Sequence, residues 1–342
     1  MKKNAFKKIA SPDDLMDVVM GFRQSRIVLS GFELGVFSAL GDKRKTSAEV
    51  ARALGLDRRG TDRLMNALCA LGLLRKSAGF FSNTSFSARY LSKGKPGYLA
   101  GLGHSARLWH RWGTLTQAIR KGGRVIEYPT ESKEEEKRRI EGFIASMHQR
   151  ASARAPRIVR MINLSGVQRT LDIGAGSGAF SIEFVRAKGD IRATVFDLPE
   201  VIPFTRKYVA KAGLSSRFAF KPGDFSRDDI GSGYDLILLS AIIHMNSLPE
   251  NLRLFRKCVQ ALGPGGRLVI SDHIMSDDRT RPAYGAIFAL NMLVNTRAGD
   301  TYTEREIRTS MKEAGLVKIS RRGQPFDSSL LIGTKPGQKR PG

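Results

Sequence analysis

The segment TLDIGAGSGAF, residues 170–180, decides the fold class of this chain. Residues 170–173 form a short apolar run typical of a buried strand, and the pattern over 179–187 predicts a helix. Three glycines lie between them, and glycine lets the backbone approach a ligand closely. A strand, a glycine loop and a helix in this order are typical of α/β folds that bind nucleotides.

The spacing around the glycine loop discriminates between ligands. Dinucleotide-binding folds use G-x-G-x-x-G, but here the third glycine comes one residue early. Asp172 precedes the loop, where a carboxylate disfavours a phosphate and suits an ammonium group. Asp197 ends the next predicted strand, about 20 residues beyond the loop, where a carboxylate suits a ribose diol. S-adenosylmethionine carries a ribose, an ammonium group and a sulfonium but no phosphate, so the pattern predicts this cofactor.

Later strands add candidate residues at the same edge of the sheet. Asp224 and Phe225 are predicted to end a third strand, one hydrogen-bonding an adenine and the other packing against it. His244 follows the fourth predicted strand, 234–239, and ligands of open α/β sheets bind beyond the carboxyl ends of the strands. His244 is therefore a candidate general base, and Asp272, which closes the fifth strand, would orient its imidazole.

The two halves of the chain differ in periodicity. Residues 12–165 are nearly all helical in pattern, whereas 168–335 alternates short apolar runs with amphipathic helices, which predicts a doubly wound parallel sheet. In the first half a capping box at 46–49 opens a helix, a second helix follows Asp57, and 73–83 is predicted to form a hairpin. Helix, turn, helix and hairpin is the winged-helix pattern. It serves either DNA binding or packing between subunits, and the pattern does not separate these uses.

Composition limits the class of protein. The chain has 342 residues, 41% apolar and 26% charged, which is typical of a globular protein with about two domains. Its net charge of +25 leaves nucleic acid, anionic lipid and acidic substrates open as partners. Two cysteines without a CxxC pair and five histidines without HExxH spacing exclude a disulfide framework and predict no bound metal. Neither a membrane span nor a secretory signal is predicted, so we expect a cytoplasmic protein.

Seven segments together resemble the S-adenosylmethionine-dependent small-molecule O-methyltransferases of the plant and acetylserotonin type. They are GFELGVFSAL (31–40), LDIGAGSGAF (171–180), VFDLPEVI (195–202), GDF (223–225), IIHMNS (242–247), GPGGRLVISD (263–272) and YTEREIRTSMKEAGL (302–316). The resemblance implies a Rossmann-like class I methyltransferase sheet of seven strands, the last antiparallel, behind a winged-helix dimerisation domain. The implied divisions are a dimerisation domain over 12–100, a helical linker and acceptor-pocket lid over 101–166, a cofactor-binding domain over 167–336, and basic tails over 1–11 and 337–342.

The resemblance also assigns residues to the cofactor and to the base. His244 falls on the family's catalytic base, and Asp272 falls where many members have a supporting glutamate. Three positions depart from the family. Ser240 stands where a basic residue is frequent, and Thr301 stands where the plant enzymes have a second supporting glutamate. The family often has His-Asp-Trp where this chain has His244-Met245-Asn246. The predicted cofactor-binding residues are Asp172, Gly174, Gly176, Gly178, Asp197, Leu198, Asp224, Phe225 and Ser240.

The favoured function is methyl transfer to a hydroxyl of a small aromatic or polycyclic metabolite. An imidazole can accept the hydroxyl proton as attack proceeds. The acceptor pocket is predicted to be formed by the helical half and by the helix over 283–294. Its candidate residues are Phe143, Met147, Phe288, Asn291 and Met292, with Trp109 and His110 as further candidates.

Other functions stay open at this point. The net charge, together with Arg58, Arg59 and Arg63 on the second winged-helix helix, supports a nucleic-acid-associated protein, either an RNA methyltransferase or a winged-helix regulator. Against it, the basic residues are spread along the chain, and a Pro-Cys or Asn-Pro-Pro-Tyr catalytic loop is missing. Some relatives have switched to non-methylating chemistry with the same cofactor. A degenerate fold kept only for pairing would bind no cofactor, which the intact glycine loop disfavours.

A homodimer is implied by the resemblance and fits the helical half. A lone helical layer with apolar faces, such as those of Val18, Phe22, Val36 and Phe37, would bury them against a second copy. The predicted partners are thus a small-molecule acceptor and a second copy, with no nucleic acid.

Overall fold

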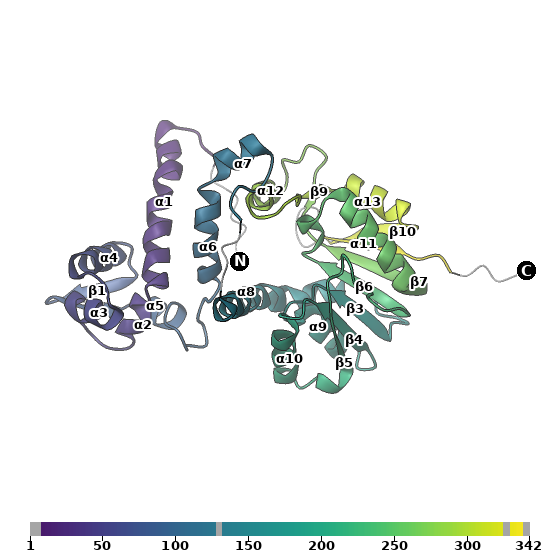
Figure 1. Ribbon diagram of the computed structural model, residues 1–342, viewed down its shortest axis with the longest axis horizontal. Coiled ribbons are helices and arrows are strands. Elements are labelled where there is room, and N and C mark those ends of the chain that lie inside the picture. Colours follow the sequence, from purple (N-terminus) through teal and green to yellow (C-terminus); the bar gives the residue numbers. More distant parts are fainter. Residues whose placement is uncertain (1–7, 128–131, 324–328, 338–342) are drawn as a thin grey trace, which may run out of the picture. The chain divides into compact units, whose positions relative to one another are not determined.

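The computed structural model describes residues 8–127, 132–323 and 329–337. The chain divides into two compact units, Met1–His110 and Arg111–Gly342, and each is described by itself (Figure 1). Of the predicted basic tails, residues 1–7 and 338–342 lie outside the described residues. The three-part division expected from the sequence stays a prediction.

The N-terminal unit has the predicted order of helix, turn, helix and hairpin. Thr46 and Glu49 form the capping box that begins α3, and Asp57 caps α4. The hairpin turns at Ala78 and Gly79, whose φ angles of 49° and 79° suit a two-residue turn of type I′. The elements are α1 (Pro12–Glu33), α2 (Val36–Leu40), α3 (Ser47–Leu54), α4 (Arg58–Ala70), β1 (Leu74–Ser77), β2 (Phe80–Asn83), α5 (Ser85–Tyr90) and α6 (Leu102–Trp112), the last reaching past His110.

Val36 and Phe37 lie in the core of the N-terminal unit. Both are fully buried, and they pack in one cluster with Met65, Leu68 and Phe81. The prediction that Val36 and Phe37 are buried against a second copy is wrong. The helices and the hairpin of the same unit already cover these two side chains, so α2 holds this unit together.

A seven-stranded sheet forms the centre of the C-terminal unit, in the order β10-β11-β7-β6-β3-β4-β5. β11, the last strand, runs antiparallel to both of its neighbours, and the other pairs are parallel. This confirms the predicted fold class. The strands are β3 (Arg169–Ile173), β4 (Arg192–Asp197), β5 (Phe218–Pro222), β6 (Tyr234–Ser240), β7 (Leu262–Ser271), β10 (Val317–Arg322) and β11 (Leu330–Thr334), with a separate pair β8 (Ile274–Met275) and β9 (Tyr302–Thr303).

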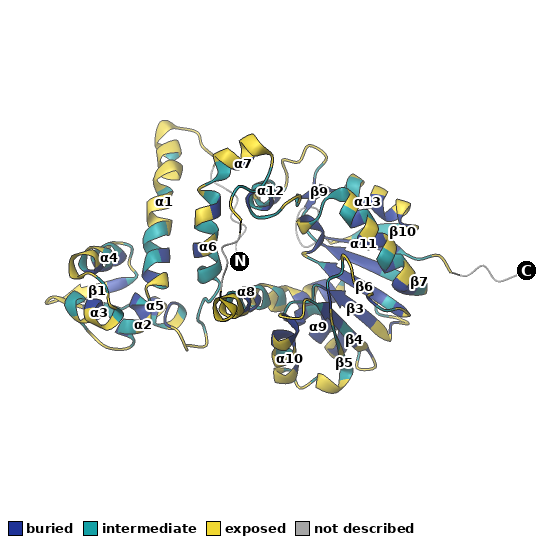
Figure 2. Ribbon diagram, in the orientation of Figure 1, coloured by how far each residue is buried: buried dark blue, intermediate teal, exposed yellow. Residues whose placement is uncertain are grey.

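Helices cover both faces of this sheet, and alternate strand residues face them. In β6, Leu236 and Leu238 pack with α8 and α9, whereas Ile237 and Leu239 pack with α11 and α13. The central strands are accordingly buried, with exposed residues on the outer helix surfaces (Figure 2). The helices of this unit are α7 (Leu115–Lys121), α8 (Lys133–Arg160), α9 (Ala179–Ala187), α10 (Ile202–Lys211), α11 (Leu248–Ala261), α12 (Ala283–Asn295) and α13 (Glu304–Glu313), with the short 3-10 turns η1 (Ser215–Arg217) and η2 (Ile243–Met245).

One strand end differs from its prediction. β5 ends at Pro222, so Asp224 and Phe225 lie beyond the strand. The backbone N–H of Asp224 donates to the Asp228 carboxylate at 2.8 Å, and the Asp224 carboxylate accepts the N–H of Ser226 at 2.8 Å. These local hydrogen bonds replace a strand ladder with a turn.

A search of the described helices for membrane spans finds none that is both long enough and apolar enough to cross a bilayer.

Candidate functional site

The candidate site lies where the strand order reverses. β3 pairs with β4 on one side and with β6 on the other, and the chain reaches β6 only after it has built β4 and β5. The loops after β3 and β6 therefore leave the same edge of the sheet in opposite directions. Such a switch point is where open α/β sheets bind their ligands.

The glycine loop after β3 has no room for side chains at its start. A Cβ added at Gly174 would lie 2.2 Å from Cδ1 of Ile242, and the φ of Gly174 is +67°. Gly178 begins α9 with a φ of +71°. Gly176 ties the loop to its surroundings, since its N–H donates to Oδ2 of Asp197 at 2.7 Å. Its carbonyl accepts the Thr205 hydroxyl at 2.6 Å. Gly174 and Gly176 are half-buried, and the two hydrogen bonds of Gly176 fix the loop in place.

Asp172 lies behind the glycine loop rather than on its surface. It is 2% exposed, and its carboxylate accepts the Ser181 hydroxyl at 2.8 Å. Burial raises the pKa of Asp172 to about 7, although the hydrogen bond from Ser181 opposes this rise. Direct contact of Asp172 with an ammonium group stays a prediction.

The carboxylate of Asp197 lies against the loop, as a ribose-binding group would. Its Oδ1 accepts the N–H of Leu198 at 2.8 Å, while its Oδ2 holds Gly176. Burial raises the pKa of Asp197, and the two backbone hydrogen bonds oppose that rise. Leu198 itself is 41% exposed, and its side chain is free to cover a ligand at this edge.

The adenine-side candidates lie in the turn after β5. The Asp224 carboxylate accepts the Ser226 hydroxyl at 2.6 Å and pairs with Arg227 at 3.0 Å. The hydrogen bond from Ser226 is the main cause that lowers the pKa of Asp224, and Arg227 adds to it. Phe225 is half-buried against the core under α11. Ser240, half-buried, ends β6 opposite Ser271 of β7.

His244 and Asp272 come together as predicted. Nδ1 of His244 lies 2.7 Å from Oδ1 of Asp272, and the two side chains are 11% and 2% exposed. Oδ1 of Asp272 also accepts the backbone N–H of His273 at 2.8 Å. Oδ2 of Asp272 is buried and has no hydrogen-bond partner among the described residues. Burial acts to raise the pKa of Asp272, but His244 and then His273 outweigh it and hold this pKa below its usual value. The carboxylate is thus ionised near neutral pH.

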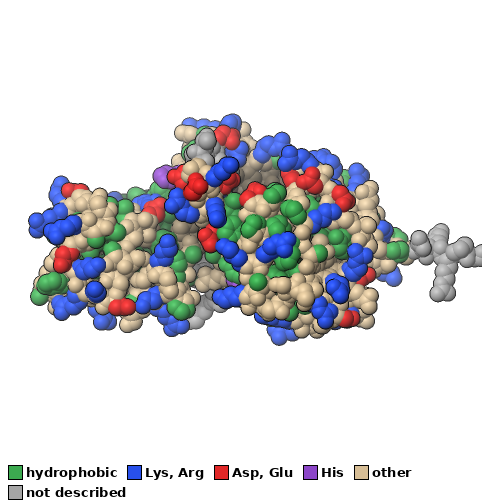
Figure 3. Space-filling view, turned by 60° about the horizontal axis from the view of Figure 1, so that its bottom comes forward, with side chains coloured by type: hydrophobic (Ala, Val, Ile, Leu, Met, Phe, Trp, Pro, Cys, Tyr) green, Lys and Arg blue, Asp and Glu red, His purple; other side chains and the backbone are tan. Residues whose placement is uncertain are grey.

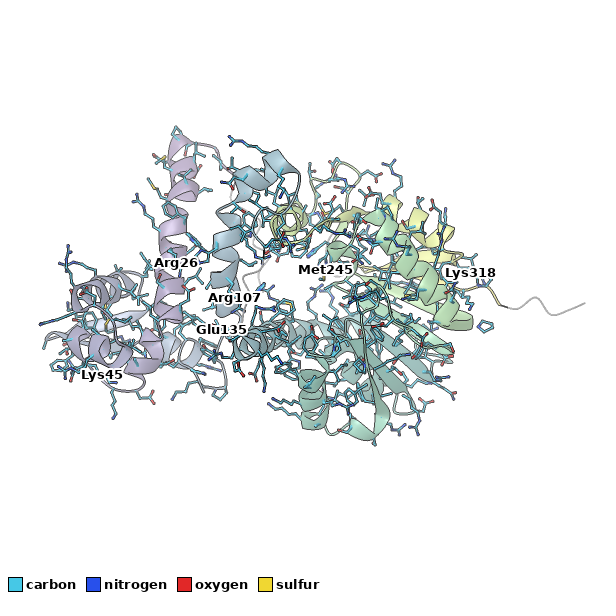
Figure 4. The ribbon with its side chains drawn as sticks, in the orientation of Figure 1. Arg26, Lys45, Arg107, Glu135, Met245 and Lys318 are labelled. Atoms are coloured by element: carbon cyan, nitrogen blue, oxygen red, sulfur yellow. The ribbon has the colours of Figure 1, made fainter. Side chains whose placement is uncertain are left out.

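The turn that carries His244 is held by several backbone contacts. Ala241, a non-glycine residue with a φ of +58°, redirects the chain after β6, and Asn251 donates its side-chain amide to the Ile243 carbonyl at 2.8 Å. The backbone carbonyl of His244 accepts the N–H of Asp300 at 3.0 Å. Figure 4 labels Met245, which is 52% exposed at the end of this turn. The imidazole is therefore presented from a rigid turn.

The predicted acceptor residues on α12 divide into two groups. The Phe288 ring meets the His244 ring edge-on, with 4.9 Å between ring centroids. Asn291 is occupied, since its Oδ1 accepts the indole N–H of Trp112 at 3.0 Å, and Met292 is buried. The structure thus brings Phe288, but not Asn291, into contact with the candidate base.

The remaining predicted acceptor residues are not brought to His244 by any described contact. On α8, Phe143 is 39% exposed and Met147 is half-buried. Trp109 and His110 belong to the N-terminal unit. Thr301 is buried, and its hydroxyl donates to the Gly285 carbonyl at 3.4 Å, so it buttresses α12 rather than the base.

His148 is a residue that the sequence analysis missed. Its Nδ1 lies 2.9 Å from the Ser177 hydroxyl in the glycine loop, and its ring stacks on Tyr208 of α10 at 4.0 Å. Ile144, one turn earlier on α8, lies next to Gly176. Only the i, i+4 spacing of Ile144 and His148 hints at this contact, because the partner lies in a different element.

We expect His148→Ala to raise the Kd for S-adenosylhomocysteine by about threefold to tenfold, the worth of one hydrogen bond that fixes a loop. Ser177→Ala should do the same, and the double variant should add little more. Titration calorimetry measures these constants. Gln149→Ala, on the exposed side of the same helix, is the matched control. An unchanged Kd in His148→Ala would show that the contact does not support the loop.

No group of three or more His, Cys, Asp or Glu side chains within the described ranges is placed to hold a metal ion.

Comparison with known proteins identifies the family. Residues 112–317 match the model of the O-methyltransferase domain, which is more than half of the chain, and residues 16–93 match the O-methyltransferase dimerisation domain. The chain belongs to the O-methyltransferase family. The winged-helix unit is accordingly the family's dimerisation domain, and the sheet with its glycine loop belongs to the methyltransferase domain.

Relatives of this O-methyltransferase cover nearly its whole length. It is 32% identical to the 3-hydroxy-5-methyl-1-naphthoate 3-O-methyltransferase of Streptomyces sahachiroi, over 95% of each chain. It is 28% identical to the tetracenomycin polyketide synthesis 8-O-methyl transferase TcmO of Streptomyces glaucescens, over 96% of this chain and 98% of that one. The solved structure of PigF with SAH is 26% identical, covers 95% of this chain and 100% of that one, and has a TM-score of 0.84. The predicted enzyme class, S-adenosylmethionine-dependent methyltransferase, and the predicted cofactor are confirmed.

Proposed function

We propose that this O-methyltransferase transfers a methyl group to a hydroxyl of a small aromatic or polycyclic metabolite, with His244 as general base. The observation that carries the proposal is the 2.7 Å contact between Nδ1 of His244 and Oδ1 of Asp272 at the switch point of the sheet. It leaves Nε2 of His244 for an acceptor hydroxyl. The naphthoate and polyketide named for the two Streptomyces relatives support an aromatic acceptor.

The residues at the loop fit the cofactor. The start of the loop has no space for a Cβ, the Asp197 carboxylate lies against Gly176, and Leu198 is partly exposed beside them. S-adenosylmethionine, when bound, supplies an electrophilic methyl group. Asp197 would bind the ribose hydroxyls, and Asp224 and Phe225 would hold the adenine.

The chain's own part in the reaction is to position the acceptor and to take its proton. His244 accepts the hydroxyl proton at Nε2 as attack proceeds. The ionised Asp272 fixes the ring with Nε2 unprotonated and stabilises the imidazolium that results, in the way of other base–carboxylate pairs. Holding the acceptor in line for attack supplies much of the rate.

Two measurements test the proposed function. Calorimetry with S-adenosylmethionine and S-adenosylhomocysteine establishes cofactor binding. Mass spectrometry then follows methylation of a panel of naphthols, hydroxynaphthoates and hydroxyanthraquinones, with His244→Ala alongside. We expect product from at least one phenolic acceptor and loss of most of it in the variant. Cofactor binding with no methylated hydroxyl in the panel would overturn the aromatic O-methyl acceptor.

Nucleic acid is not the expected substrate. Lysine and arginine side chains are spread over the face that Figure 3 shows, rather than collected in a single stripe. Phosphate binding weakens steeply as salt rises. We therefore expect no salt-sensitive RNA or DNA binding. Separately, we retain the prediction that the enzyme works in the cytoplasm.

We also propose that two copies pair through the N-terminal unit. Val18 and Phe22 of α1 are 59% and 51% exposed, and a row of other apolar side chains on this helix is exposed with them. Light scattering should give twice the subunit mass for the native chain. It should give the mass of one subunit for the double variant that carries both Val18→Asp and Phe22→Asp. Lys43→Asp, on an exposed loop, should stay dimeric. A native chain with the mass of one subunit at micromolar concentration would contradict the pairing.

A further inference from the structure

A second imidazole lies beside the proposed base. His273 follows Asp272 directly, and its ring centroid is 6.3 Å from that of His244. The backbone N–H of His273 donates to the same Asp272 oxygen that holds His244. Oδ1 of Asp272 therefore contacts the ring of His244 and the backbone of His273.

Aromatic rings of α12 hold the His273 ring in place. Phe288 lies 4.5 Å and Tyr284 5.4 Å from it, measured between ring centroids. Phe288 also packs edge-on against His244, so one phenyl ring touches both imidazoles. The two histidines and Phe288 thus form one aromatic wall.

The ring nitrogens of His273 are not used by the fold. Within the described part of the chain neither nitrogen has a hydrogen-bond partner, and neither is among the fully buried polar atoms that lack one. Burial is the main cause that lowers the pKa of His273; Asp272 opposes this lowering, and His244 and Arg154 add to it. A neutral imidazole offers one donor and one acceptor.

We propose that His273 hydrogen-bonds a second oxygen of the acceptor, so that the preferred substrates are aromatic rings with two oxygen substituents on adjacent or peri positions. One oxygen is the hydroxyl that His244 deprotonates, and the other is a hydroxyl or carbonyl held by His273. This inference rests on the proposed function, in which His244 is the base.

The distances allow this arrangement. Neighbouring oxygens on such rings lie about 2.7 Å apart, and each would lie about 2.8 Å from its imidazole nitrogen. The two ring centroids are 6.3 Å apart, so one nitrogen from each imidazole can hold one oxygen of such a pair when the pair lies alongside both rings. The apolar face of Phe288 between them would pack on the acceptor ring. A substrate with a single oxygen would leave the buried His273 imidazole without this hydrogen bond, which would lower kcat/KM for that substrate.

Matched acceptors test the inference. The probes are 2,3-dihydroxynaphthalene against 2-naphthol, and 1,8-dihydroxynaphthalene against 1-naphthol, with kcat/KM corrected for two equivalent hydroxyls. We expect the native enzyme to prefer at least one diol by about tenfold or more. His273→Phe keeps the aromatic packing but removes the nitrogens, so the preference for the diol should fall to about threefold or less. His273→Gln should restore part of the preference.

Diols and naphthols also differ in intrinsic reactivity. This difference is the same for every variant, so it cancels when the preference of a variant is compared with that of the native enzyme. Tyr284→Phe, which removes the hydroxyl of the neighbouring ring, is the matched control and should keep the preference. The inference is overturned if His273→Phe keeps the preference, if Tyr284→Phe loses it instead, or if the native enzyme has none while it methylates the naphthols. If cofactor binds and none of the four probes nor any panel compound is methylated, the proposed function itself fails.

Discussion

Replacing His244 by alanine lowers kcat by about 100-fold to 10,000-fold and leaves the Kd for S-adenosylhomocysteine within about twofold. In the proposed mechanism the imidazole takes the acceptor proton, whereas the loop after β3 and Asp197 would hold the cofactor. Steady-state methylation of the best panel acceptor gives kcat, and calorimetry gives Kd. Loss of both together would show that the variant perturbs the fold of the η2 turn rather than proton transfer.

Asp272→Asn separates orientation from charge in the same site. The amide has the shape of the carboxylate but can donate to Nδ1 of His244, which leaves Nε2 protonated and unable to act as a base. We expect kcat to fall by about tenfold or more, with cofactor affinity unchanged. Asp277→Asn, on the exposed loop after β8, is the control and should keep full activity. Full activity in Asp272→Asn would remove the carboxylate from the mechanism.

The second large effect is expected at Asp197. Asp197→Ala should raise the Kd for S-adenosylhomocysteine by about 100-fold. Two ribose hydroxyls would donate to the charged carboxylate, each hydrogen bond to a charged group is worth about 1.5 kcal/mol, and 1.4 kcal/mol corresponds to tenfold in Kd. The change also frees the N–H of Gly176, which the carboxylate holds at 2.7 Å. In the proposed binding mode the ribose then loses its partner, and the loop loses the hydrogen bond to Gly176.

Asp190→Ala provides the comparison for this effect. Asp190 comes just before β4, is exposed, and pairs with Lys188 at 3.1 Å. Its removal should leave the Kd unchanged. Thermal unfolding of both variants shows whether the C-terminal unit stays folded. A change of less than about threefold for a folded Asp197→Ala would place the ribose elsewhere.

Much of the architecture follows from local sequence signals. The capping box at Thr46 and Glu49, the turn at Ala78-Gly79 and the strand–loop–helix at 170–187 each depend on neighbours in sequence, and each is present. The pairing of His244 with Asp272 could also be expected, because they follow β6 and β7, and consecutive parallel strands usually lie side by side with their carboxyl ends at the same edge.

Other features depend on contacts between elements and could not be predicted. The patterns of Val36 and Phe37 showed an apolar face but not which surface covers it, and the unit's own core does so. His148 reaches the glycine loop from a helix about 30 residues earlier in the chain, and this contact exists only after α8 has packed on α9 and α10. The positive φ of Ala241 has no sequence signal of its own, because a left-handed alanine is set by its surroundings.

The position of β11 has a consequence for the order in which the chain can fold during synthesis. The N-terminal unit is built from contacts within its own first third of the chain, so it can fold early. The sheet cannot be completed then, because Leu330–Thr334 must insert between β7 and β10, about 60 residues after β7 itself. Until that strand emerges from the ribosome, β7 has an open, apolar edge. A chain broken before residue 330 would therefore join a folded N-terminal unit to an incomplete, aggregation-prone sheet. If copies pair through that unit as proposed, such a fragment would also trap intact copies.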